Sequence, residues 1–273
     1  MDTHIVAVYC LCADLLVALH HRNDVQCQLT DAEIMTIALV ATLFFGGNYA
    51  LACAFLQEQG YMHRMLSRSR FNRRVHRIKD LFLTLVAVLG EHWKAVNTES
   101  VYLIDSFPVA SCDNIRIARS QRYQGEAYRG YIASKRRYFY GLRVHLVVTV
   151  TGAPVEFFLV PGADNDTGAL QWYQFDLPAG ATIVGDKAFN VYGIEDDLAQ
   201  VGIDLCPLRK KNSKRAIPPW ETYLRELARK AIETTNSLIT RRFPKTIHAV
   251  TAGGFELKIV LFLLAQSIDG LVR

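Results

Sequence analysis

The sequence has little of what a disulfide-stabilised, secreted or disordered protein requires. Its six cysteines form no CxxC pair and no disulfide-like spacing, and Cys10 and Cys12 lie in an apolar helical stretch, so buried free thiols are expected. Of the 273 residues, 51% are apolar and 21% are charged, which excludes disorder and allows one large or two smaller domains. The first residues lack the basic start of a signal peptide, so the sequence predicts a reduced cytoplasmic location.

Acidic residues are nearly missing from three basic segments. Residues 64–79 and 209–215 contain no Asp or Glu, and residues 116–143 carry eight Lys or Arg against one acid, Glu126. Aromatic residues lie between the basic ones, a pattern that suits a polyanionic partner. A solvated surface would explain any single segment equally well. Three such segments together favour nucleic acid.

Residues 34–56 lack any charged side chain, which raises the possibility of a membrane span. The sequence Gly46-Gly47-Asn48 interrupts this run where one helix would end and another begin. Two buried helices joined by a tight turn explain the run better than a membrane span does. We therefore expect no membrane partner.

Residues 1–97 are predicted to form an all-helical N-terminal domain. Thr30 to Glu33 is a capping box that opens a helix, Asn48 is expected to cap the next one, and a third is predicted from Arg70 to Trp93. The basic face of that third helix suits a DNA-binding helical domain, although a plain structural bundle fits the same pattern equally well.

Residues 98–273 are predicted to form a second domain with strands. Alternating apolar residues indicate a strand at 101–105, a hairpin over 142–160, and short strands at 181–186 and 203–206. Helices are expected after Asn165 or Asp166 and over 191–201, 220–242 and 255–271. This order describes a mixed sheet covered by helices. His145 is expected to be a satisfied sheet histidine rather than a ligand, and Asp166 a helix cap rather than a metal ligand.

Two acids follow apolar strands of this domain. Asp105 and Asp186 each end a predicted strand, where a lone buried carboxylate is costly unless a cation meets it. Carboxylate oxygens are typical ligands of hard divalent cations, so we interpret the two acids as ligands of a metal site that Glu233 completes. Asp105 could instead cap a turn, and Asp186 could pair with Lys187 or Arg119. Taken alone, Glu233 is explained better as a partner of Arg229 at i, i+4.

Four blocks resemble bacterial insertion-sequence DDE transposases: Tyr102-Leu-Ile-Asp105-Ser, Tyr140-Gly-Leu-Arg-Val-His145, Val184-Gly-Asp186-Lys-Ala-Phe and Arg229-Lys-Ala-Ile-Glu233. The resemblance covers roughly residues 67–245. It implies an RNase H-like catalytic fold, predicted here as a mixed five-stranded sheet flanked by helices. It also places the third acid at Glu233 and turns Arg229 towards DNA. Related families have Tyr and Lys where this chain has Glu226 and Thr240, and Glu226 is a competing third acid.

The resemblance implies a DNA transposase with two Mg²⁺ (or Mn²⁺) ions per active site. Asp105, Asp186 and Glu233 would be the catalytic residues and metal ligands for cleavage at terminal inverted repeats and for strand transfer into target DNA. Because two ends must be paired, a homodimer or higher assembly is expected on double-stranded DNA, in a bacterial cytoplasm. Alternatives are a non-transposing nuclease of the RNase H or resolvase type, and an inactive DNA-binding remnant or repressor. The predicted DNA-binding residues are Arg70, Arg73, Arg74, Arg77, Lys187, Arg209, Lys210, Lys211 and Arg229.

Overall fold

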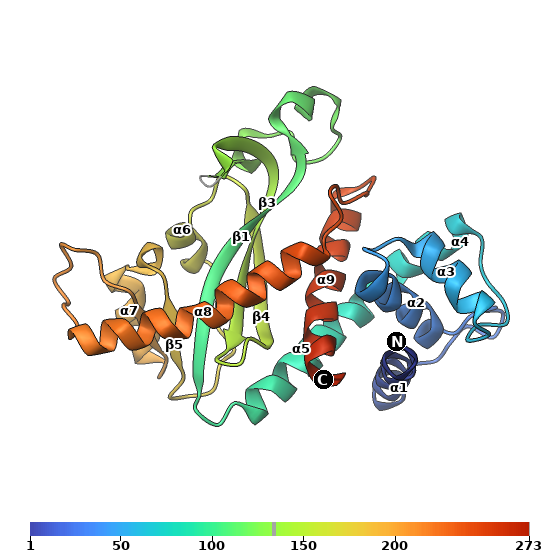
Figure 1. Cartoon of the computed structure of the whole chain (residues 1–273), viewed down its shortest axis with the longest axis horizontal. Coiled ribbons are helices and arrows are strands. Elements are labelled where there is room, and N and C mark those ends of the chain that lie inside the picture. The colour runs from blue at the N-terminus through green and yellow to red at the C-terminus, as the bar shows by residue number, and fades with distance from the viewer. Residues whose placement is uncertain (133–134, 273) are drawn as a thin grey trace. The chain divides into compact units, whose positions relative to one another are not determined.

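The computed structural model describes residues 1–132 and 135–272, which form two compact units (Figure 1). Unit 1 comprises Met1–Val88 together with Ile239–Arg273, and unit 2 comprises Leu89–Leu238. The sequence predicts a division of the chain into 1–97 and 98–273. In the structure the C-terminal segment Ile239–Arg273 groups with the N-terminal helices instead of with the sheet.

Unit 1 is built around one buried helix, α2 (Asp31–Phe44). The helix is apolar on all sides and packs against α1 (Asp2–Ala18), α3 (Tyr49–Glu58) and α9 (Ala252–Val272), as expected for a helix that no face exposes to water. Its start is the predicted capping box, with the hydroxyl of Thr30 accepting from the Glu33 N–H and the Glu33 carboxylate accepting from the Thr30 N–H.

The uncharged run of residues 34–56 forms two helices, as predicted. Gly46 and Gly47 adopt positive φ angles of 55° and 77°, and the Asn48 side chain then accepts from the first N–H groups of α3. No single helix among the described residues is long and apolar enough to cross a membrane, whereas α2 and α3 pass that test only as a pair bent by 109°.

The single helix predicted from Arg70 to Trp93 is two helices, α4 (Arg68–Arg77) and α5 (Lys79–Val96). The chain bends at Ile78, whose φ of −100° and ψ of 20° end α4. Ile78 donates its N–H to the Arg74 carbonyl, and Leu81 donates to the Ile78 carbonyl, so hydrogen bonds continue across the break. The apolar residues of 70–93 recur at helical spacing and predict one buried stripe, and Phe71 and Val75 before the break and Phe82 and Leu85 after it are buried accordingly.

Unit 2 contains one mixed sheet of six strands, one more than predicted. The strands are β1 (Val101–Asp113), β2 (Arg129–Ile132), β3 (Arg137–Thr149), β4 (Pro154–Pro161), β5 (Thr182–Gly185) and β6 (Asp204–Pro207). The order is β2-β3-β1-β5-β6, with β4 also paired to β3. The added strand, β2, lies in the basic segment 116–143 and pairs with the start of β3.

Strand β1 is much longer than the predicted strand 101–105, so the prediction that Asp105 ends its strand was wrong. β3 pairs with β1 from Tyr102 to Asp113, whereas β5 pairs with it only from Val101 to Leu103. Long-range pairing with β3, which no local pattern reports, keeps the chain extended. Pro108 fits because β1 has lost its β5 neighbour at that point, and a strand with one open side tolerates a residue without an N–H.

The two faces of the sheet have different contents. Tyr102 and Ile104 point into an apolar core together with Ile183, Leu205 and residues on the segments around α6 (Asp166–Leu170) and α7 (Tyr192–Gln200). Asp105, one residue on, points to the opposite face, which the long helix α8 (Pro219–Arg242) crosses (Figure 1).

The apolar pattern of helix α8 predicts a core face of Leu224, Leu227, Ala228, Ala231, Thr235 and Leu238, and the structure bears this out only in part, since Thr235 is buried. Leu224 and Leu227, expected in the core, are 52% and 47% exposed. The buried side consists of Arg225, Ile232, Thr235, Asn236 and Ile239. Polar side chains are thus turned inwards from the middle of this helix.

Lys94 at the end of α5 is expected to stabilise unit 2. Its Nζ lies 3.1 Å from the Glu156 carboxylate, both side chains are 7% exposed, and the ammonium also donates to the Asp176 carbonyl. Lys94→Met leaves a buried carboxylate without its cation and is expected to lower the free energy of unfolding by about 3 kcal/mol. The matched control is Glu91→Gln, since Glu91 also pairs with Lys94 but is 65% exposed. Equal effects of the two changes in urea denaturation would contradict this assignment.

Candidate active site

Asp105 and Asp186 meet at the carboxyl end of the parallel β1–β5 pair. The last paired residues are Leu103 and Val184, so each acid follows the ladder by two residues. Asp186 caps the short 3₁₀ helix that follows β5, accepting the Lys187 N–H at 2.5 Å. Asp105 accepts a hydrogen bond from the side-chain amide of Asn236 on α8 at 2.9 Å. Carboxyl ends of parallel strands commonly hold ligands, because the chain departs there and leaves room.

The surroundings of Asp105 disfavour its negative charge. Burial raises the pKa of this carboxyl to about 6. The Ser106 N–H and the Arg229 guanidinium act against that shift, while the carboxylates of Asp166 and Asp186 add to it. Asp105 therefore lies among like charges with one nearby guanidinium to offset them.

Arg229 connects the other two predicted acids. Its Nη1 lies 3.5 Å from Asp186 Oδ1, and its Nη2 lies 3.2 Å from Glu233 Oε1. The i, i+4 pair that explained Glu233 from local sequence is thus present, and the same guanidinium also reaches Asp186. Glu226, the competing third acid, is exposed, and so is Glu233, whose side chain is 57% exposed, so exposure does not distinguish the two acids. Glu233 is the acid on α8 that shares a partner with the strand-end site.

The carboxylate oxygens of this site suit a hard divalent cation, but the side chains are not arranged around a single point. Within residues 1–132 and 135–272, no group of three or more His, Cys, Asp or Glu is placed to hold a metal ion. The available donors are carboxylate oxygens, and the charge crowding at Asp105 is of the kind that a bound cation relieves. The alternative in which Asp105 caps a turn fails, because residues 106–108 continue the strand.

A second polar cluster lies on the opposite face of β1, directly after Asp105. Ser106 donates its hydroxyl to Asp166 at 2.5 Å and accepts from Arg143 at 3.2 Å. Asn165, rather than Asp166, caps α6. Asp166 is therefore free to approach the site, and its charge acts on Asp105. No local motif predicts this contact, because it depends on the register that sets Ser106 opposite His145.

His145 is not the satisfied sheet histidine that was predicted. The side chain is fully buried, stacks on Phe158 with ring centroids 4.6 Å apart, and has no hydrogen-bond partner for either ring nitrogen among the described residues. Its Nε2 lies 3.7 Å from Asp166 Oδ1. Burial lowers the pKa of His145 to about 4, so the ring is neutral at pH 7.

A family model described as a transposase DDE domain matches residues 95–248, more than half of the chain. The chain belongs to this family of DDE transposases. No curated protein matches it. Its fold is similar to that of a piggyBac transposase, solved by cryo-EM as a synaptic complex with hairpin DNA. The TM-score is 0.51 at 11% identity, over 96% of this chain and 70% of the other.

These comparisons confirm the RNase H-like fold, with its mixed sheet flanked by helices and its helical N-terminal region. They also confirm that the chain is a DNA transposase with a DDE domain. Members of this family generally use divalent metal ions, in keeping with the oxygen donors at the strand ends.

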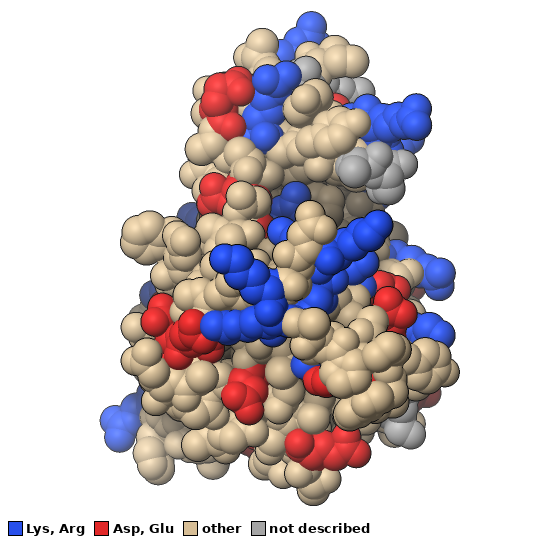
Figure 2. Space-filling view, turned by 90° about the vertical axis from the view of Figure 1, so that its left-hand side faces the viewer, with Lys and Arg blue, Asp and Glu red and all other residues tan. Residues whose placement is uncertain are grey.

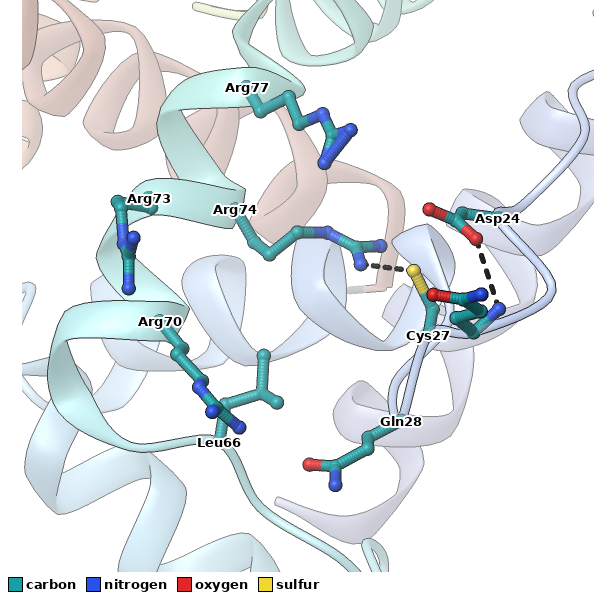
Figure 3. Close-up of a pocket in the computed structure, with 9 residues that line it drawn as sticks. Asp24, Cys27, Gln28, Leu66, Arg70, Arg73, Arg74 and Arg77 are labelled. Carbon is teal, nitrogen blue, oxygen red and sulfur yellow. Dashed lines mark hydrogen bonds between the residues drawn. The ribbon is translucent and has the colours of Figure 1, made fainter.

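Four of the predicted DNA-binding arginines of the transposase lie together on α4. Arg70, Arg73, Arg74 and Arg77 line a hollow of about 550 Å³ beside the loop of Asp24–Gln28 (Figure 3). Arg74 is tied down, because it donates to Cys27 and to the 9%-exposed Asp31 at 2.5 Å. Arg70, Arg73 and Arg77 are exposed or half-exposed and line the same hollow. The basic face of α4 therefore divides into one structural arginine and three surface arginines.

The basic segment 209–215 divides in the same way. Arg209 forms two hydrogen bonds of 2.6 and 3.0 Å with the buried Glu195 carboxylate, so its guanidinium is engaged within the protein. Lys210, Lys211 and Lys187 are exposed. On the face shown in Figure 2, Lys and Arg side chains gather in a band across the middle, with acidic side chains beside and below it.

Asp105→Asn is expected to stabilise the metal-free transposase above pH 6. A raised pKa means that folding disfavours the ionised carboxylate, so the penalty is absent well below pH 3.8, grows between pH 3.8 and about 6 and is constant above that range. The neutral amide avoids this penalty, which we place at about 1–3 kcal/mol. Thermal unfolding in EDTA over pH 4–8 measures it. A variant that is less stable than the parent at pH 7.5, or whose margin does not change with pH, would sink the assignment.

Proposed function

We propose that the transposase cuts DNA at the terminal inverted repeats of its own insertion sequence and joins the freed 3′ ends to target DNA. The observation that carries this proposal is the meeting of Asp105 and Asp186 at the end of the β1–β5 ladder, with Glu233 linked to Asp186 through Arg229. Acids from a strand, a strand end and a helix approach one place from different directions, as an in-line displacement at phosphorus requires.

Asp105, Asp186 and Glu233 would hold two Mg²⁺ or Mn²⁺ ions. When bound, such ions activate the attacking oxygen and neutralise the charge on the leaving one. Asn236 fixes the orientation of Asp105 through its hydrogen bond. Asp186 is oriented by the Lys187 N–H. Arg229 would pass from the carboxylates to a DNA phosphate once the cations take its place, since its charge and fork geometry suit either anion.

Double-stranded DNA is the proposed partner, both as the element's ends and as the target. The exposed α4 arginines, Lys187 and the pair Lys210 and Lys211 would hold its phosphates, which makes binding strongly salt-dependent. Since two ends have to be brought together before joining, we propose a homodimer or higher assembly on DNA.

Cleavage is the direct test of this proposal. Labelled duplex carrying the inverted repeat and flanking DNA is incubated with the transposase and Mg²⁺, Mn²⁺ or chelator. We expect metal-dependent cuts at the repeat boundary and joined products. Asp105→Asn, Asp186→Asn and Glu233→Gln are each expected to lower the rate at least about a hundredfold, because each removes charge that the transition state depends on. The matched control is Glu226→Gln, an exposed acid on the same helix, which should leave the rate unchanged.

The alternatives give different results in the same assay. Cuts without joined products would indicate a nuclease that does not transpose. Tight binding without cutting under either metal would indicate a DNA-binding repressor or remnant. If Glu226→Gln abolished cleavage and Glu233→Gln did not, the third acid would be misassigned.

The three surface arginines of α4 are expected to supply phosphate contacts. Changing Arg70, Arg73 and Arg77 together to Ala should lower duplex affinity and reduce the slope of log affinity against log salt by about three. Fluorescence anisotropy at several salt concentrations measures the slope. Arg74→Ala is the matched control: Arg74 is committed to Asp31, so its loss should lower the thermal stability and leave the slope unchanged. If the salt dependence of binding changed for Arg74→Ala and not for the triple variant, Arg74 would be the phosphate contact and the other three arginines would not.

A further inference from the structure

The β2–β3 hairpin has one face that is packed and one that is not. Gly130 and Phe139 lie directly opposite each other on the packed face. A Cβ added to Gly130 would come within 2.5 Å of the Phe139 ring and 2.3 Å of the Gly162 carbonyl oxygen, so this face has no spare room. The hairpin is thereby fixed to the sheet of unit 2 and holds its other face towards solvent.

Two tyrosines stand side by side on the solvent face. Tyr131 and Tyr138 are direct cross-strand partners, with ring centroids 4.9 Å apart and planes inclined by 51°. They remain 46% and 48% exposed. The Arg129 guanidinium lies 4.5 Å from the centre of the Tyr138 ring, a cation–π contact from the same face. These three side chains form what we call the tyrosine platform, an ordered aromatic surface that the protein's own core does not cover.

The charge around the tyrosine platform is positive. Lys135 and Arg136 precede β3, Arg137 begins it, and all three are exposed. Two acids lie nearby: Asp113 lies 3.3 Å from Arg137, and Glu126 lies 3.5 Å from Arg129 and accepts a hydrogen bond from Tyr140. Arg129, Lys135, Arg136 and Arg137 thus outnumber the two acids. Tyrosine and arginine also form hot spots between proteins, but this excess of cations favours a polyanion.

We propose that Tyr131 and Tyr138 stack on unpaired bases of the DNA, with Lys135 and Arg136 beside them to hold the phosphates. This inference rests on the proposed function, and it specifies which form of DNA the hairpin takes. In a duplex the base faces are stacked on one another and only their edges reach the grooves, so an exposed ring finds no π-face there. An unpaired strand presents its base faces, and every base can stack whatever its sequence.

The position of the tyrosine platform allows one DNA molecule to reach both it and the active site. β1 runs eight residues from Asp105 to Asp113, where it pairs with Phe139, the neighbour of Tyr138. At roughly 3.3 Å per residue the strand spans at most about 26 Å, which is close to eight base-pair steps of about 3.4 Å. In Figure 1, β1 and β3 continue together over this distance as one curved pair. A strand that is unpaired about eight nucleotides from the cut would therefore reach the tyrosine platform while the cut itself stays near Asp105.

The test compares single-stranded with duplex DNA and needs no cleavage. Binding of a labelled 20-nucleotide oligothymidylate and of a 20-base-pair duplex is measured by fluorescence anisotropy in EDTA. The paired change Tyr131→Ala with Tyr138→Ala is expected to weaken single-strand binding by about 10- to 100-fold, the scale of losing one or two stacked bases. Duplex affinity should change less than twofold. The matched control is Tyr131→Phe with Tyr138→Phe, which keeps both rings and should bind the single strand as the parent does.

A second measurement uses the unaltered protein, so it does not depend on any variant folding. A single strand carrying 2-aminopurine should lose fluorescence on binding, because stacking on an aromatic ring quenches this base. Equal single-strand binding by the alanine variant, an equal loss for duplex, or unquenched 2-aminopurine would overturn the proposal. If the protein binds single strands through the tyrosine platform but never cuts DNA, the proposed transposition chemistry is wrong and the platform proposal still holds. Failure of one proposal can therefore be distinguished from failure of the other.

Discussion

The electrostatic environment of Asp105 depends on the point at which β1 stops pairing with β5 and continues to pair with β3 alone. β5 leaves β1 after Leu103, while β3 stays paired to Asp113, so Asp105 is held rigidly from one side and is open on the other. Because successive residues of a strand face opposite sides, Asp105 turns towards α8 and Ser106 turns towards α6. The same short stretch of backbone therefore anchors polar groups on both faces of the sheet. The chain tolerates this concentration of negative charge because Arg229 and Asn236 lie on the helix that crosses above it.

Helix α8 shows what this arrangement demands of the sequence. A helix selected for stability alone would bury Leu224 and Leu227, yet both are exposed, and Asn236 and Thr235 are buried in place of apolar residues. Arg229, Glu233 and Asn236 follow at spacings of four and three, which puts them on one side of the helix. Placing that side over Asp105 leaves the leucines outside. A local pattern broken in this way is expected where function sets the packing.

The sequence was sufficient for features that local chemistry decides. The capping box at Thr30, the Asn48 cap and the hairpin of β3 and β4 all follow from neighbouring residues, and each is present. The length of β1 could not be predicted, because its second half is extended only through pairing with β3, where Phe107 lies opposite Val144 and Asp113 opposite Phe139. Asn236 was missed and Asp166 was assigned to a helix cap for the same reason: their contacts with Asp105 and Ser106 join residues far apart in the chain.

The number of basic residues in a segment indicates the class of partner, but it does not identify the side chains that contact that partner. The acid-free segments pointed to a polyanion, but three of their arginines are paired with acids that lie outside those segments: Arg74 with Asp31, Arg209 with Glu195, and Arg215 with Glu195 and Asp196. Asp31 and Glu195 are buried, so breaking their pairs with Arg74 and Arg209 would leave a charge without compensation, and these two arginines are held in place rather than available. The cations open to DNA are those that the fold leaves exposed, such as Arg70, Lys210 and Lys211. A basic segment thus predicts that the protein binds a polyanion. Which basic side chains contact the polyanion depends on the acidic residues that the fold places beside them.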